Sequence, residues 1–115
     1  MYYSKVLYIY RELSKQSLVY VPHFAFALLD LAKVKMNGNV EIATDYYEAA
    51  REVFAELAKK CPEKYTPYQA KAVFKKAVIQ NDKAGLKEAF LLAKKYPDNF
   101  ESRIIIVTIP LMLKG

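Results

Sequence analysis

Hydrophobic residues recur every three or four positions along most of this chain of 115 residues, a spacing typical of amphipathic helices rather than strands. The clearest example covers residues 40–61, where one apolar stripe lies opposite a charged side. The stripe consists of Ala43, Tyr46, Tyr47, Ala50, Val53, Phe54, Leu57, Ala58 and Cys61. We therefore expect a long helix that buries this stripe and ends before Pro62, which cannot continue it.

Two helices are expected before this one. The first covers about residues 3–15, where apolar residues again fall at helical spacing. The second runs from Pro22 to Met36 and is apolar nearly all round, a pattern typical of a central helix. It should stop at residues 37–39, where Gly38 can take the left-handed conformation that closes many helices.

Two more helices are expected after it. Thr66 and Gln69 match a capping box and Pro67 suits a first helical turn, so the fourth helix should begin there. Asp82 can cap a fifth helix, which should end before Pro97. The core residues expected on the fourth and fifth helices are Ala70, Val73, Phe74, Ala77 and Val78, and Leu86, Ala89, Phe90, Ala93 and Tyr96, respectively.

The chain ends with SRIIIVTIPLMLKG, whose conformation the pattern leaves open. Its β-branched run, residues 104–109, favours a strand, but no other segment alternates with period two, so a strand would lack a partner within the chain. A sixth helix, opened by Asp98 or Ser102 and kinked by Pro110, is the preferred interpretation. An extended tail, or a strand paired across an oligomer interface, is the alternative.

Together these elements predict an all-α protein of five or six helices in antiparallel hairpins, either a short helical-repeat array or a compact bundle. The length fits a single domain over residues 1–115, which should bury about two-thirds of the unfolded chain's surface. Three Gly and five Pro are too few for a loop-rich β sandwich.

Two stretches nearly repeat each other: LAKKCPEKY, residues 57–65, and LAKKYPDNF, residues 92–100. In each, Leu and Ala fall on the apolar stripe and two lysines face the negative end of the helix dipole before Pro stops the helix. The aromatic residue three positions beyond the Pro, Tyr65 or Phe100, is expected to fold back over the helix end. We interpret the repeat as one helix terminator used twice.

The two copies begin 35 residues apart, a spacing typical of stacked helical hairpins. Positions that match the small, aromatic, Gly and Pro positions of one such family are Ala50, Phe54, Pro62, Gly85 and Pro97. Over residues 22–115 the layout thus resembles tetratricopeptide repeats, although Ala89 replaces the second aromatic residue and no Trp or Leu-Gly pair marks either unit. The resemblance implies a concave surface that binds peptides or proteins, and no catalysis.

Positive charge is concentrated in the second half of the chain. Residues 1–57 hold six Lys/Arg and seven Asp/Glu, whereas residues 58–115 hold twelve and five. The lysines that would form a surface for anions or nucleic acid are Lys59, Lys60, Lys71, Lys75, Lys76, Lys83, Lys87, Lys94 and Lys95. Interleaved with tyrosines, they suit a sequence-nonspecific nucleic-acid-binding protein, which is the alternative hypothesis for function.

The preferred hypothesis is a non-catalytic protein-interaction module that binds a protein partner or itself, as a homo-oligomer. Tyrosines near the N-terminus exceed what one helix can bury, Tyr is favoured at interfaces, and no element follows the apolar last segment to cover it. The residues predicted to form this interface are Tyr2, Tyr3, Tyr8, Tyr10, Ile105, Ile109, Leu111 and Met112.

Residues that would indicate an enzyme are sparse. His23 is the only histidine and has no partner at metal spacing, and Cys61 falls on the buried stripe as a small core residue does. The acidic face formed by Asp45, Glu48, Glu52 and Glu56 is typical of a solvated helix. Phosphate-binding glycine loops and nucleophile elbows are missing from the sequence. We therefore expect no catalytic, cofactor or metal site.

Location is inferred from features that the sequence lacks. A lone cysteine and the absence of a basic-then-apolar leader at Met1 give no support for export, so a cytoplasmic location is expected. The apolar runs are shorter than the roughly 20 residues of a membrane-spanning helix, so no membrane partner is expected. Ten Tyr, no Trp and many Lys and Glu form a thermophile-like composition.

Overall fold

The computed structural model describes Tyr8, Glu12 and residues 20–114. These residues form five helices, α2 (Tyr20–Lys35), α3 (Val40–Lys60), α4 (Pro62–Gln80), α5 (Lys83–Lys94) and α6 (Phe100–Lys114). All regular structure in them is helical, which confirms the all-α class. The predicted first helix, residues 3–15, lies outside the described residues apart from Tyr8 and Glu12.

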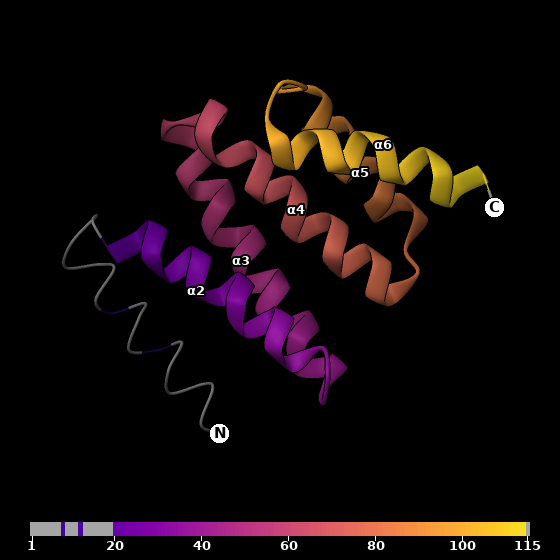
Figure 1. Ribbon diagram of the computed structural model, residues 1–115. Helices are drawn as coiled ribbons and strands as arrows, with labels where there is room; N and C mark the ends of the chain where they lie inside the picture. Colours follow the sequence, from indigo (N-terminus) through magenta and orange to yellow (C-terminus); the bar gives the residue numbers. More distant parts are fainter. Residues whose placement is uncertain (1–7, 9–11, 13–19, 115) are drawn as a thin grey trace.

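Each helix packs against the next one along the chain, as successive antiparallel hairpins do, and α4 also contacts α6. Figure 1 shows α4 in the middle, with α2 and α3 on one side of it and α5 and α6 on the other. Two hydrophobic clusters meet on α4, one shared with α2 and α3, the other with α5 and α6. The central helix therefore holds the two hairpins together.

An aromatic cluster joins the first three described helices. The ring of Phe26 on α2 lies edge-on to Phe54 on α3, with centroids 5.3 Å apart, and to Tyr68 on α4 at 4.8 Å. Phe54 and Tyr68 stack at 5.5 Å. Edge-on and offset contacts of this kind favour aromatic pairs beyond the area that they bury, which fixes how these helices pack.

Helix α4 begins earlier than expected, and the prediction of a capping box at Thr66 is wrong. α3 ends at Lys60, and Pro62 opens α4 after the single residue Cys61. Pro suits the first helical position because its missing N–H would have no intrahelical partner there. Thr66 and Pro67 lie inside α4 and are buried.

The closure expected at Gly38 is also wrong, since no described glycine has positive φ. α2 ends in a turn in which Asn39 N donates to Lys35 O at 2.7 Å, and Asn39 Oδ1 then accepts from Ile42 N to cap α3. The left-handed residue is Asn81, with φ of 51°, at the end of α4. Asn tolerates this conformation better than most residues do.

The last segment is a helix, which confirms the preferred interpretation over a strand. Its cap is Asn99, whose Oδ1 accepts from Glu101 N at 2.8 Å and Ser102 N at 3.3 Å, so the prediction of Asp98 or Ser102 as cap is wrong. Burial of Ile105 and Ile109 against α4 and α5 outweighs the strand propensity of the β-branched run.

The core residues largely match the expected stripes. On α4 the exception is Val78, which is 43% exposed. Of the expected core residues on α5, Leu86, Ala89 and Ala93 lie deepest. Both LAKK stretches lie at helix ends, as expected. Tyr65 is buried near Phe54, but Phe100 is 74% exposed and covers no helix end, so that expectation is wrong.

Candidate functional site: apolar surfaces of α5 and α6

Helix α6 has apolar residues on two opposite faces. Its inner face, Ser102, Ile105 and Ile109, is buried. The opposite face carries large apolar residues that solvent reaches: Phe100 (74% exposed), Ile104 (43%), Val107 (63%) and Leu111 (67%). We call these four residues the outer stripe. Their spacing of four, three and four positions keeps them on one side of the helix.

Only some residues of the predicted interface are accessible to a partner. Ile105 and Ile109 are each 1% exposed and belong to the core of the chain itself, so the prediction that they contact a partner is wrong. Helical periodicity turns them away from solvent. Leu111 and Met112 are 67% and 41% exposed, and their contact with a partner stays a prediction. Tyr8 is 65% exposed, and Tyr2, Tyr3 and Tyr10 lie outside the described residues.

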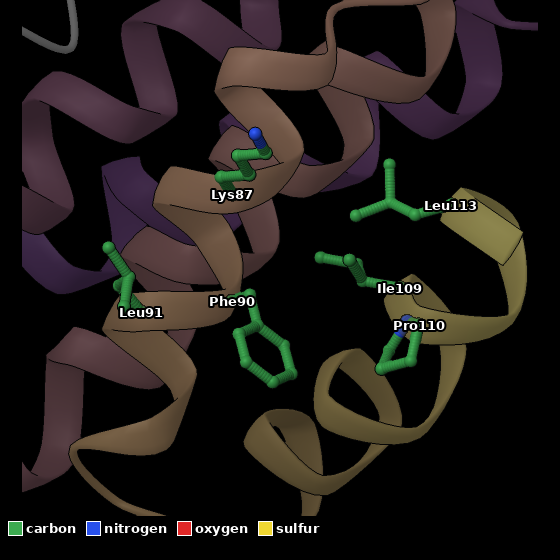
Figure 2. Close-up of a pocket in the computed structure, with 6 residues that line it drawn as sticks. All are labelled: Lys87, Phe90, Leu91, Ile109, Pro110 and Leu113. Carbon is green, nitrogen blue, oxygen red and sulfur yellow. The ribbon is translucent and has the colours of Figure 1, made fainter.

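A second apolar surface is a groove between α5 and α6 with a volume of about 360 Å³. It is lined by Lys87, Phe90, Leu91, Ile109, Pro110 and Leu113. Figure 2 shows Phe90 of α5 beside Ile109 and Pro110 of α6, with Lys87 farther along α5. Apart from the ammonium of Lys87, these side chains offer no hydrogen-bonding group, so the groove suits apolar side chains.

Three of the lysines predicted to form one basic surface pair with carboxylates. Lys59 pairs with Glu56 at 3.0 Å, Lys71 with Glu101 at 3.5 Å, and Lys76 with Glu48 at 2.8 Å. The remaining members of the predicted set that lie on α5 or at its end are Lys83, Lys87, Lys94 and Lys95, all exposed. Lys60 and Lys75 are exposed on α3 and α4. Solvent-accessible ion pairs of this kind are weak, so the surface for anions or nucleic acid stays a prediction.

A polar cleft of about 260 Å³ lies where α3, α4 and α5 meet. In it, Arg51 Nε donates to both carboxylate oxygens of Glu48 at 3.0 Å, and Lys76 Nζ donates to Glu48 Oε2. Chiefly because of the bond from Arg51, the pKa of Glu48 falls from 4.5 to about 2. A carboxylate that stays ionised at neutral pH is no general acid, so this cluster ties α3 to α4.

His23 and Cys61 show no sign of an activated nucleophile and base. His23 is exposed on α2, and the Cys61 thiol donates to Glu63 Oε1 at 3.2 Å. That bond to a carboxylate is the main cause of a raised pKa for Cys61, which opposes formation of the nucleophilic thiolate. Within the described part of the chain, no group of three or more His, Cys, Asp or Glu residues could hold a metal ion.

Comparisons with known proteins add no relative. No protein-family model matches the chain, and no curated protein or solved structure matches it either. The resemblance to tetratricopeptide repeats therefore stays a prediction. Among the described helices, none is both long enough and apolar enough to cross a membrane.

Proposed function

We propose that this protein is an interaction module that self-associates through the outer stripe of α6. The observation that carries the proposal is the exposure of four large apolar residues on the face of α6 opposite the core. An exposed apolar patch on a folded protein is typical of a site that another surface covers. Here the covering surface is the same stripe on a second copy.

The spacing of the stripe supports pairing with itself. The order four, three, four reads the same in both directions, so two α6 helices related by a two-fold axis can lie antiparallel with their stripes in register. Phe100 then faces Leu111 of the second copy, and Ile104 faces Val107. An interface of this kind is isologous, because the same surface contributes on both sides, and the spacing is that of helices packed along a heptad seam.

Charge at the ends of α6 favours the same arrangement. In this register Lys114 of one copy comes level with Pro97 of the other, one position from Asp98, so a cation and a carboxylate lie near each other. The Asp98 side chain is fully exposed, and its carboxylate lies 3.8 Å from the guanidinium of Arg103. Antiparallel pairing therefore brings opposite charges together at both ends of the seam.

The test is the mass of the protein in solution, measured by light scattering and sedimentation over a range of concentrations. We expect a concentration-dependent dimer, and we expect Val107→Glu to be a monomer with unchanged helix content, because it places a charge at the centre of the seam. Val34→Glu is the matched control. Val34 is 67% exposed on α2 and Val107 is 63% exposed on α6, so only the position differs.

The control should dimerise as the wild type does. A wild-type monomer at the highest soluble concentration would contradict the proposal, and so would a dimer that Val107→Glu leaves intact. A dimer that both variants abolish equally would also contradict it, because the effect would then follow from added charge and not from the stripe.

A further inference from the structure

The groove between α5 and α6 is a second surface, separate from the outer stripe. Its residues on α6, Ile109, Pro110 and Leu113, fall on the side of the helix that faces α5, whereas the stripe points away from the core. The two surfaces can thus be occupied independently. We infer that this groove binds an acidic amphipathic helix of a partner protein.

The first argument is the shape and lining of the groove. Two neighbouring helices form its walls, and its length covers about one turn of each, from Lys87 to Leu91 and from Ile109 to Leu113. A volume of about 360 Å³ suits a small number of large apolar side chains. An amphipathic helix presents such side chains together, at positions three and four apart, which is how helices are recognised by apolar grooves.

The second argument is the charge of the rim. Lys83, Lys87 and Lys94 lie on one side of α5, since they are four and seven positions apart, and all three are exposed. Lys114 follows Leu113 at the α6 edge of the groove. Acidic residues on the partner helix, beside its apolar anchors, would face these cations on both sides.

Nearby carboxylates do not neutralise this rim. Glu88 of α5 lines the separate polar cleft with Arg51 and Lys76. Glu101 of α6 pairs with Lys71 of α4. No Asp or Glu among the described residues lines the groove, so the lysines around it are available to an acidic partner.

The lining favours a protein helix over nucleic acid. Nucleic-acid surfaces combine cations with hydrogen-bonding groups or with open aromatic faces on which bases stack. Phe90 is the aromatic residue of the groove, it is half-buried, and the ammonium of Lys94 lies 5.4 Å from its ring centroid. The other apolar lining residues are aliphatic, so they favour apolar anchors over bases.

The experiment measures binding of a labelled synthetic helix by fluorescence anisotropy. The probe peptide carries Leu at positions i, i+3, i+4 and i+7 and Glu on its other faces, and a scrambled peptide has the same composition without the periodicity. We expect the probe to bind and the scrambled peptide to bind at least about tenfold more weakly, because it presents no continuous apolar face. Leu113→Asp should weaken binding of the probe.

Lysine variants test the rim. Lys87→Glu combined with Lys94→Glu should raise the Kd of the probe about tenfold, through lost attraction and added repulsion. Lys60→Glu combined with Lys64→Glu is the matched control. It makes the same change in net charge at exposed positions, and Lys64 lies 5.4 Å from the Tyr65 ring centroid as Lys94 does from that of Phe90. The control should bind the probe as the wild type does.

The same titration on Val107→Glu separates this inference from self-association. If the groove is the site, this variant binds the probe with wild-type affinity, and amide resonances of Leu91 and Leu113 shift on titration. The inference is overturned if the probe does not bind, if the scrambled peptide binds equally, or if both lysine pairs matter equally. It is also overturned if Val107→Glu abolishes binding, or if a single-stranded oligonucleotide of equal charge binds the rim lysines more tightly than the probe.

Discussion

Gly85 of α5 lies against Ala77 of α4 so closely that a Cβ atom on Gly85 would stand 2.9 Å from the Cβ of Ala77. It would also stand 2.8 Å from Asp82 Oδ2, the end of a movable side chain. The contact with Ala77 is the harder one to relieve, because that Cβ is fixed to a helix backbone. The small residue at position 85 thus sets how closely the two helices approach each other.

Gly85→Ala should therefore destabilise the protein, although Ala is the better helix former by about 1 kcal/mol. Forcing extra atoms into a packed contact costs about 1–3 kcal/mol, so we expect a net loss of about 1 kcal/mol in the free energy of unfolding, measured in urea. Gly38→Ala is the control. Among the described residues, nothing lies within 4 Å of a Cβ at Gly38, and its φ is not positive.

The control should be neutral or more stable by about 0.4–1 kcal/mol, because Ala restricts the unfolded chain. Combining Gly85→Ala with Ala77→Gly should cost less than the sum of the two single changes, since it removes the opposing methyl group. A Gly85→Ala protein as stable as Gly38→Ala would show that the two helices do not meet so closely.

Acid should weaken the connection between α3 and α4 at Glu48. The folded-state pKa of Glu48 is about 2, below its ordinary value of 4.5, so the ionised group stabilises the fold above pH 4.5. That contribution is lost as pH falls from 4.5 towards 2. After allowance for its partial exposure, we expect about 1–2 kcal/mol to be lost over this range.

Unfolding in urea at a series of pH values checks this expectation. Glu48→Gln should be less stable than the wild type at pH 7 and should lose less stability between pH 4.5 and 2. Lys76→Gln removes the bond of 2.8 Å to Glu48 and leaves the one from Arg51. It should therefore show an intermediate pH dependence, and the double variant should resemble Glu48→Gln. Identical pH profiles for all four proteins would contradict the assigned role of Glu48.

The start of α6 depends on Asn99 and not on its neighbour Asp98. Asn99→Ala should lower the free energy of unfolding by about 1 kcal/mol, because two backbone N–H groups lose the acceptor that caps them. Asp98→Ala removes a fully exposed side chain whose contact with Arg103 is long, at 3.8 Å, and should change stability little. The two variants differ by one position, and a larger loss for Asp98→Ala would reverse the assignment of the cap.

Local pattern predicted most of the fold. The stripes of α3 and α5 specify buried faces, and both LAKK stretches lie at helix ends. Two of the wrong predictions concerned the starts of α4 and α6, where several local signals are equally plausible. Pro62 and Pro67 both suit a first helical turn. Asp98 and Ser102, the predicted caps, and Asn99, the observed one, are all of residue types that cap helices, so local pattern does not decide between them.

The candidate surfaces were harder to predict, because they depend on contacts between distant segments. The pairing of Glu48 with Lys76 and of Lys71 with Glu101 joins residues about 30 positions apart, which no local spacing reveals. The sequence marked the last segment as apolar, but which of its residues face the core depends on how α6 lies on α4 and α5. The groove forms between α5 and α6, so only the folded structure reveals it.

Two adjacent isoleucines on α6 separate the core from the proposed interface. Ile105 is 1% exposed and Ile104 is 43% exposed. Ile105→Ala should lower the free energy of unfolding of the monomer by about 2–5 kcal/mol, because it leaves a cavity among packed residues. Ile104→Ala should cost the monomer much less, and instead raise the Kd for dimerisation, since its side chain faces the second copy.

Both variants are best made in the Val107→Glu background as well as in the wild type, so that stability is compared without dimerisation. In that background Ile104→Ala should unfold at nearly the same urea concentration as its parent, and Ile105→Ala at a much lower one. In the wild-type background, sedimentation should show weaker dimerisation for Ile104→Ala. If instead Ile104→Ala destabilises the monomer as much as Ile105→Ala does, the outer stripe belongs to the core and cannot be the surface that meets a second copy.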